Sequence, residues 1–151
     1  MREPSSSIDE VQVGIIDQMS GLEVGLARYE YLIAQGDALP AADGELRTDR
    51  YAIPGCQVSV WIRAELEDGR LRLSGDSDAR INRGMVALLL RVLNGRTPAE
   101  ILAAELFFLD RTELRAQLSP IRANGLAAMV RQIRGYAGEC AGAHELATRR
   151  A

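Results

Sequence analysis

The chain has 151 residues and a formal net charge of -3, with 47% hydrophobic and 26% charged residues. These values are typical of one globular domain over residues 1–151 that buries its own core, and they favour neither a nucleic-acid nor a membrane partner. No apolar run reaches the roughly 20 residues of a membrane helix, and the polar N-terminus lacks a secretory signal, so we expect a cytoplasmic protein.

Two amphipathic helices are predicted at the start of the chain. Apolar side chains recur at helical spacing in residues 8–19 and again in residues 22–35, where Gly36 is the expected stop. The following segment, residues 37–45, is polar and contains alanine, proline and glycine, so it is expected to be a loop.

The hydrophobic period then changes to two, which predicts about three antiparallel strands. The first is expected over residues 47–53, and the next two flank an Asp68-Gly69 hairpin turn. Placing that turn at the tip pairs opposite charges and pairs apolar side chains with each other. The predicted pairs are Glu67 with Arg70, Glu65 with Arg72, Leu66 with Leu71, Ala64 with Leu73, and Trp61 with Asp76.

The remainder of the chain predicts three or four helices. Their expected signals are Ser77 or Asp78 as a cap, a stop at Asn94-Gly95, a capping box at residues 97–100, a short helix over 110–118, and a last segment opened by Ser119-Pro120. Segregated strands and helices predict an α+β domain, in which a small antiparallel sheet carries helices on one face. Residues 1–7 and the polar tail 140–151 are expected to be mobile.

Cys56 is the candidate reactive residue. Pro54-Gly55 is a favoured central pair of a type II turn, so Cys56 is the fourth residue of a tight turn at a strand edge. The hairpin register places it at the same end of the sheet as residues 75–78 and the start of the next helix. A helix N-terminus favours the thiolate, whereas the carboxylates of Asp76 and Asp78 disfavour it.

The inventory of reactive side chains limits the chemistry of this thiol. All 18 basic residues are arginine, so an internal Schiff base to pyridoxal phosphate and a P-loop lysine are excluded. The only histidine is His144, and the only other thiol is Cys140. Exchange with a disulfide or persulfide needs only a thiolate and an accessible partner. The alternative interpretation is that Cys56 is a small buried hydrophobe.

Three ordered segments resemble a known family. Residues 55–61, Gly-Cys-Gln-Val-Ser-Val-Trp, resemble the Gly-Cys-Gln-x-x-Val-Trp signature of SufE-like sulfur acceptors, and residues 75–79, Gly-Asp-Ser-Asp-Ala, match the second signature. Residues 119–129 resemble the third, and residues 28–33 fit the N-terminal helix. The resemblance covers residues 22–137 and departs from the usual pattern at Val58, where a short polar residue is common.

The resemblance implies a fold shared with U-type cluster scaffolds and a function. Cys56 would accept sulfane sulfur from a SufS-type cysteine desulfurase, stimulate that enzyme, and pass the sulfur to a SufBCD-type scaffold. No resident cofactor or metal is expected, only a transient Cys56 persulfide, in a monomer or weak homodimer. The residues implied around the Cys56 loop, or at the partner surface, are Gly55, Gln57, Trp61, Gly75, Asp76, Asp78, Arg122 and Asn124.

Other functions stay open at this point. A cluster scaffold needs about three or four thiolate-type ligands, so one core cysteine would require a site shared between subunits. A thiol peroxidase or hydrolase would lack a nearby histidine and would need Cys140 as its resolving thiol. Cys140 and His144 have helical ligand spacing, but two ligands make a poor metal site.

Overall fold

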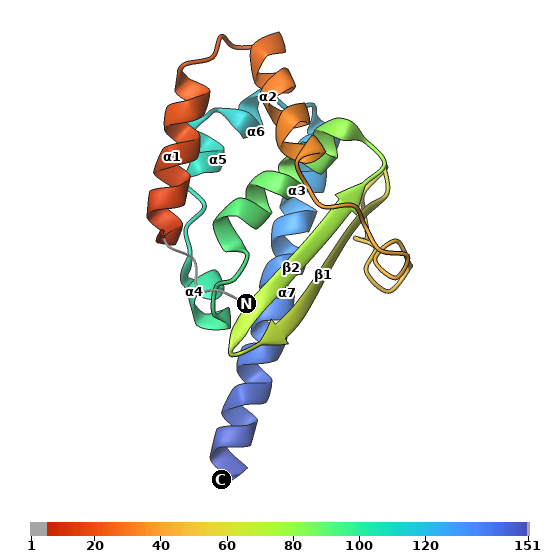
Figure 1. Ribbon diagram of the computed structural model, residues 1–151, viewed down its shortest axis with the longest axis vertical. Coiled ribbons are helices and arrows are strands. Elements are labelled where there is room, and N and C mark those ends of the chain that lie inside the picture. The colour runs from red at the N-terminus through yellow and green to blue at the C-terminus, as the bar shows by residue number, and fades with distance from the viewer. Residues whose placement is uncertain (1–5, 151) are drawn as a thin grey trace.

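A β-hairpin crosses the molecule, and two helices, α3 and α7, pack on one of its faces (Figure 1). The computed structural model describes residues 6–150, with side chains through residue 142. The elements are α1 (Ile8–Ser20), α2 (Leu26–Asp37), β1 (Val60–Glu67), β2 (Arg70–Ser77), α3 (Arg80–Leu93), α4 (Pro98–Ala103), α5 (Phe108–Arg111), α6 (Leu114–Gln117) and α7 (Pro120–Arg150). The predicted α+β class, with helices on one face of a small antiparallel sheet, is confirmed.

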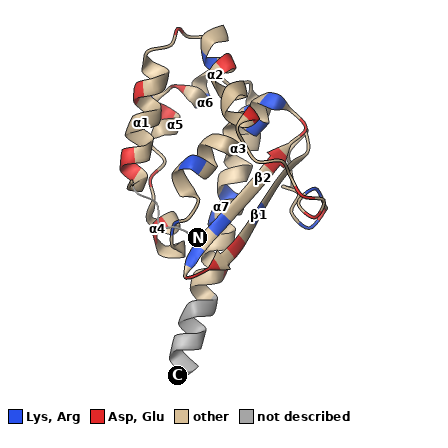
Figure 2. Cartoon of the chain, in the orientation of Figure 1, with Lys and Arg blue, Asp and Glu red and all other residues tan. Residues whose placement is uncertain are grey.

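The hairpin has the predicted register. β1 and β2 are antiparallel, Glu67 faces Arg70, and Trp61 faces Asp76 at the far end. Both tip residues have positive φ, 52° at Asp68 and 78° at Gly69, as the favoured two-residue hairpin turn requires. Acidic and basic residues are distributed along both strands (Figure 2), while Ile62, Leu71 and Leu73 of the hairpin are buried in the core.

The predicted strand over residues 47–53 is wrong, and the sheet has two strands. This segment forms turns instead, because Thr48 and Asp49 carbonyls accept hydrogen bonds from the backbone N–H groups three residues further on. Only its end approaches β1, where the Ile53 N–H donates to the Val60 carbonyl (2.9 Å) and the Ile62 N–H donates to the Tyr51 carbonyl (3.1 Å). The loop therefore runs beside β1 without extending the sheet.

Several helix boundaries differ from the prediction. Helix α2 begins four residues later, at Leu26, and continues through Gly36 to Asp37. The expected helix over 110–118 is two short helices, because Glu113 adopts φ 59° between them. Helix α7 continues to Arg150, so residues 140–150 extend the last helix. Residues 1–5 and 151 lie outside the described part, and the expected mobility of both ends stays a prediction.

Two glycines explain how α2 and α3 pack. A Cβ on Gly36 would come within 2.8 Å of the Gly84 backbone nitrogen, and a Cβ on Gly84 would overlap the backbone of Leu32. Gly36 is therefore a contact point between helices and not the predicted stop.

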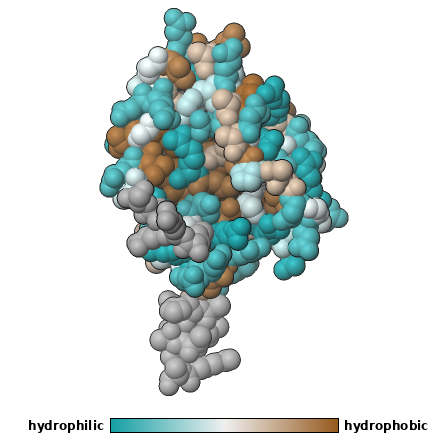
Figure 3. Space-filling model, in the orientation of Figure 1, coloured by the Kyte–Doolittle hydropathy of each residue, from teal (hydrophilic) through white to brown (hydrophobic). Residues whose placement is uncertain are grey.

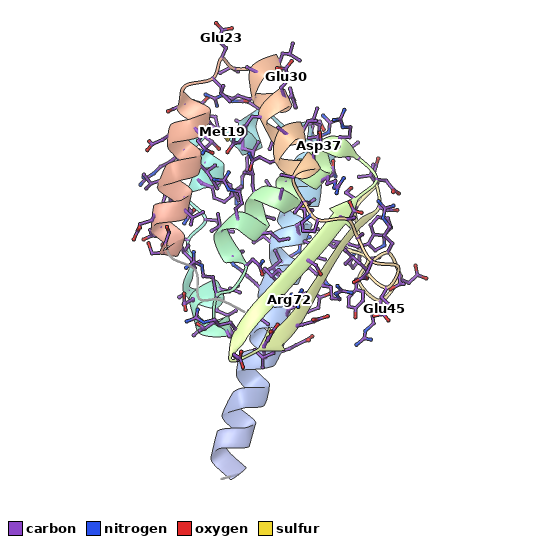
Figure 4. The ribbon with its side chains drawn as sticks, viewed as in Figure 1. Met19, Glu23, Glu30, Asp37, Glu45 and Arg72 are labelled. Atoms are coloured by element: carbon purple, nitrogen blue, oxygen red, sulfur yellow. The ribbon has the colours of Figure 1, made fainter. Side chains whose placement is uncertain are left out.

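Met19 of α1 is fully buried in the core (Figure 4). Within the described residues, no helix is both long and apolar enough to cross a membrane.

Candidate functional site

Cys56 lies in a short loop, residues 54–59, that is closed at its base. The Ile53–Val60 backbone hydrogen bond joins its two ends, and Gly55 has φ 83°, a conformation that glycine adopts without strain. The Ser59 carbonyl accepts from the Asp78 N–H (3.2 Å) and from the Ser77 hydroxyl (2.8 Å). These hydrogen bonds attach the loop to the end of β2, so the turn that carries Cys56 is held in place.

The Cys56 side chain faces a cavity of about 370 Å³ between this loop and the first turns of α3 and α7. Helix α3 contributes one lining residue and α7 contributes three, and the residue directly before each helix also lines the cavity. The full lining is Cys56, Gln57, Val58, Ala79, Asn82, Ser119, Ile121, Arg122 and Gly125. Two helix N-termini therefore converge on one thiol, where their unpaired N–H groups favour negative charge.

The two helices are capped differently, and one cap contradicts the sequence-based expectation. Neither Ser77 nor Asp78 is the N-cap of α3; that position belongs to Ala79, which has no side-chain oxygen. The Ser77 hydroxyl is occupied with the Cys56 loop and the Ala79 N–H, and the Asp78 carboxylate binds Arg47. At α7 the Ser119 hydroxyl accepts from the Arg122 N–H (3.4 Å), so the predicted Ser119-Pro120 start is confirmed.

Burial favours the protonated form of the Cys56 thiol. Desolvation raises the pKa of the Cys56 thiol above its ordinary value, and the positive charge of Arg131 offsets part of that rise. Neither Asp76 nor Asp78, the two carboxylates expected to disfavour the thiolate, is among the causes of this shift in the pKa of Cys56. In the closed loop the group is therefore mainly a protonated thiol at neutral pH.

This shift predicts how fast Cys56 is alkylated. In a Cys140→Ser background, iodoacetamide is expected to modify native Cys56 more slowly at neutral pH than the same residue in urea-unfolded protein. Because the thiolate is the nucleophile, the native rate should rise with pH through and beyond the ordinary thiol range. The check is a pH series of alkylation rates by mass spectrometry. A native rate that levels off below neutral pH would show a lowered pKa and contradict this assignment.

Asp76 anchors a charged network beside the loop but does not reach the cavity. Its buried carboxylate accepts from Arg47 (2.7 and 3.0 Å) and from the Ser77 backbone N–H (2.8 Å). Arg83 Nε lies 3.1 Å away, close enough for an ion pair, although its N–H is not aligned for a hydrogen bond. Arg47 also binds Asp78 at 3.0 Å, so one arginine ties both aspartates to the loop that precedes the Cys56 turn.

Trp61 and Gly75 support this network from the hairpin. The Arg47 guanidinium lies over the Trp61 ring, 4.9 Å from its centroid, and Trp61 faces Asp76 across the strands. A Cβ on Gly75 would meet Val86 at 2.6 Å, so glycine lets β2 approach α3 closely. The two residues hold the frame around the Cys56 loop and do not line its cavity.

The structure thus brings together some of the predicted residues and leaves others apart. Cys56, Gln57 and Arg122 share the cavity, with Gln57 exposed at its rim and Arg122 half-buried. Gly55 shapes the turn, whereas Asn124 is exposed and does not line the cavity. Sequence reasoning missed Asn82 at the cavity wall, because its place depends on how α3 meets α7. Gly125 was noticed only as part of a family-like segment.

A second cleft is larger, about 630 Å³, but no cysteine lines it. It lies between the end of α2, the loop after it, β2 and α3, on a face where apolar side chains are exposed (Figure 3). Arg63, Arg72 and Arg91 are its basic residues. Size alone would favour this cleft, yet no thiol lies in it, so the smaller Cys56 cavity is the candidate site.

Metal binding finds no support in the described part of the chain, where no group of three or more histidine, cysteine or acidic side chains is placed to hold an ion. Both cysteines are free and half-buried there. The side chain of His144 lies outside the described residues, and the helical Cys140–His144 spacing stays a sequence observation. The residues that the structure does bring together define a thiol site.

Comparison with known proteins identifies the family. The family model for SufE, described as an Fe-S metabolism associated domain, matches residues 14–137. The sulfur acceptor protein CsdE of Escherichia coli is 41% identical over 104 residues, covering 68% of this chain and 71% of CsdE. An uncharacterized SufE-like protein of Rhizobium etli is 38% identical over 125 residues, covering 80% and 84%. The chain belongs to the SufE family, as its motifs predict.

Two further comparisons bear on length and fold. An uncharacterized SufE-like protein of Synechocystis is 43% identical over 98 residues, 65% of this chain, but the match spans only 62% of that relative. The solution structure of a hypothetical protein from Thermus thermophilus superposes with a TM-score of 0.72 at 19% identity, covering 87% of this chain and 96% of that one. The likeness to the Thermus thermophilus structure supports the α+β fold.

Proposed function

We propose that the chain is a sulfur acceptor that takes sulfane sulfur onto Cys56 from a cysteine desulfurase and relays it toward iron–sulfur cluster assembly. The observation that carries the proposal is a thiol held in a closed turn over a small cavity, with no acid–base side chain of ordinary catalytic type among the lining residues. Transfer between sulfurs needs no such group, because the leaving group is itself a thiolate.

The transfer step balances without an outside oxidant or reductant. The Cys56 thiolate attacks the outer sulfur of the donor persulfide, R–S–SH. The donor S–S bond breaks as the Cys56–S bond to the outer sulfur forms, and the donor leaves as R–S⁻. The thiol proton lost from Cys56 passes to that leaving thiolate through solvent, leaving Cys56–S–SH.

The closed loop suits storage better than reaction. Burial keeps the thiol protonated, so contact with a partner must open the turn or expose the sulfur before attack. The exposed apolar side chains at the cavity are Val58, 37% exposed, and Ile121, 53% exposed, and they flank Cys56. Apolar side chains at the rim of a functional cavity are suited to contact with another protein.

Mass spectrometry tests the acceptor role directly. The chain is incubated with a SufS-type cysteine desulfurase and cysteine, and its peptides are alkylated and mapped. We expect one added sulfur on Cys56 and none on Cys140, which lies near the C-terminal end of the described side chains. Sulfur on neither cysteine, with the desulfurase active toward a small thiol, would reject the proposal.

Opening of the turn is tested by hydrogen exchange. Binding of the desulfurase is expected to change protection at the N–H groups of Ile53 and Asp78, which close the loop at its two sides. The N–H groups of the hairpin tip serve as the control, since the tip lies at the far end of the strands from the loop. Unchanged exchange at Ile53 and Asp78 in a saturated complex would show that transfer occurs without opening.

The later steps extend the same proposal. The sulfur is expected to pass from Cys56 to a SufBCD-type scaffold, in the cytoplasm, with the chain acting as a monomer or weak homodimer. Arg122, half-buried at the cavity, and the exposed Asn124 on the same helix are proposed to contact the partner and not the metal of any cluster. Protein that turns coloured after anaerobic treatment with iron and sulfide would favour a scaffold instead.

A further inference from the structure

Asn82 is a buried polar residue with an unused side chain. Its exposed fraction is 4%, and it lies on the first turn of α3, where it forms part of the wall of the Cys56 cavity. Among the described residues its carboxamide makes no hydrogen bond, and neither does the Cys56 thiol. The carboxamide atoms are not among the buried side-chain atoms that lack a partner, so they are open to the cavity and free to bind a group that enters it.

Gly125 of α7 provides the space between these two groups. A Cβ placed on Gly125 would lie 3.8 Å from the Asn82 Nδ2 atom and 3.8 Å from the Cys56 Sγ atom. The two atoms therefore lie at equal distances from the same point. Because Gly125 has no side chain, that point is empty and opens into the cavity.

An added sulfur would extend the Cys56 side chain into this space. An S–S bond is about 2.05 Å long, so the outer sulfur of a persulfide stands beyond Sγ by that distance. With both atoms 3.8 Å from the Gly125 position, a sulfur extended from Cys56 toward that position approaches the Asn82 N–H group. The resting thiol makes no hydrogen bond to this group.

The charges around the space favour an anion. The N-termini of α3 and α7 both face it, with Ala79 and Ser119 as their capping residues. The charged side chains nearby are basic: Arg122 lines the cavity, and Arg131 lowers the pKa of Cys56. The Asp76 and Asp78 carboxylates are bound by Arg47 outside the cavity.

We infer that Asn82 is a sulfur-binding residue: its carboxamide N–H donates to the outer sulfur of a Cys56 persulfide seated over Gly125. This inference rests on the proposed function, and it names the Asn82 carboxamide as the group that binds the persulfide formed on Cys56. Hydrogen bonding to an anion is stronger than to a neutral group, so Asn82 stabilises Cys56–S–S⁻ relative to Cys56–S–SH. It acts on the persulfide and leaves the resting thiol nearly unaffected.

Asn82→Leu tests the donor, since leucine keeps a similar volume and removes the N–H group. Wild type and variant, both in a Cys140→Ser background, are loaded with inorganic polysulfide, so that persulfide formation does not depend on a desulfurase. The pH dependence of persulfide alkylation by mass spectrometry gives its acid dissociation constant. We expect this constant to fall about tenfold in the variant, the scale of one hydrogen bond to a charged group.

Two further measurements, the pKa of the unloaded Cys56 thiol and the urea midpoint of unfolding, distinguish sulfur binding by Asn82 from a structural role. The pKa of the unloaded Cys56 thiol should change far less than that of the persulfide. The variant should unfold at a similar urea concentration, because the Asn82 carboxamide makes no hydrogen bond in the resting protein. Equal shifts in both pKa values, or no shift in either, would overturn the inference.

Gly125→Ala tests the space independently. The new methyl group meets both neighbours at ordinary contact distance, so the fold is kept, and alanine favours a helix. The variant should resist urea better yet hold less persulfide, or lose it several-fold faster to added thiol. Gly135→Ala is the matched control on the same helix, because a Cβ there meets nothing within 4 Å. Equal persulfide behaviour in the two variants would overturn the inference.

Together the two experiments distinguish a failure of this inference from a failure of the proposed function. If polysulfide loads Cys56 but a desulfurase does not, the proposed function fails at the partner. If the desulfurase loads wild type and neither substitution alters the persulfide, the acceptor role holds and the Asn82 site is rejected.

Discussion

Replacing Cys56 by serine is expected to abolish sulfur acceptance and to return the partner desulfurase to its unstimulated rate. The reaction forms an S–S bond, and a serine oxygen can neither form that bond nor ionise at neutral pH. No other described group can take over, because Cys140 lies on α7 far along the chain from the cavity lining. The measurement is sulfide or alanine release by the desulfurase with increasing amounts of each protein.

The matched control is Cys140→Ser, which makes the same chemical change at the other free, half-buried thiol. It should leave sulfur acceptance and stimulation near the wild-type level. Both variants should keep the wild-type free energy of unfolding within about 1 kcal/mol, because each exchange replaces one small atom. Stimulation by Cys56→Ser at the wild-type level would mean that the chain activates its partner through contact alone.

The hairpin and the position of Cys56 could be predicted because their causes are local. Alternating side chains, a two-residue turn with positive φ and opposite charges at Glu65 and Arg72 fix one register. The Pro54-Gly55 pair places the cysteine in a turn whatever surrounds it. The strand expected over residues 47–53 failed for a local reason too, since backbone turns replaced the ladder that the alternation indicated.

What could not be predicted depends on contacts between distant segments. The raised pKa of Cys56 follows from burial against α3 and α7, which no local pattern reports. Asn82 looks like any polar residue near a helix start until α7 places Gly125 opposite it. The family resemblance drew attention to Arg122 and Asn124 equally, and only the fold shows that one lines the cavity while the other does not.

Contacts between distant segments also explain why Gly36 was taken for a helix stop. At Gly84, in the same contact, they lead to the largest expected effect on stability. Gly84→Ala should destabilise the chain by at least ~3 kcal/mol, or roughly 10 °C in Tm, because overpacking against a backbone cannot be relieved by a rotamer change. The alanine Cβ would stand 2.6 Å from the carbonyl carbon of Leu32 and overlap its oxygen, so α2 would have to move away from α3.

Gly14→Ala is the matched control, since Gly14 lies inside α1 and a Cβ there meets nothing within 4 Å. It should stabilise by about 0.5–1 kcal/mol through helix propensity, so the two identical substitutions should have opposite signs in urea unfolding. Gly84 stands two residues after Asn82, so displacement of α3 should also disturb the Cys56 cavity and slow sulfur acceptance. Stabilisation by Gly84→Ala would show that the two helices do not pack through their backbones, and the cavity that depends on their position would lose its support.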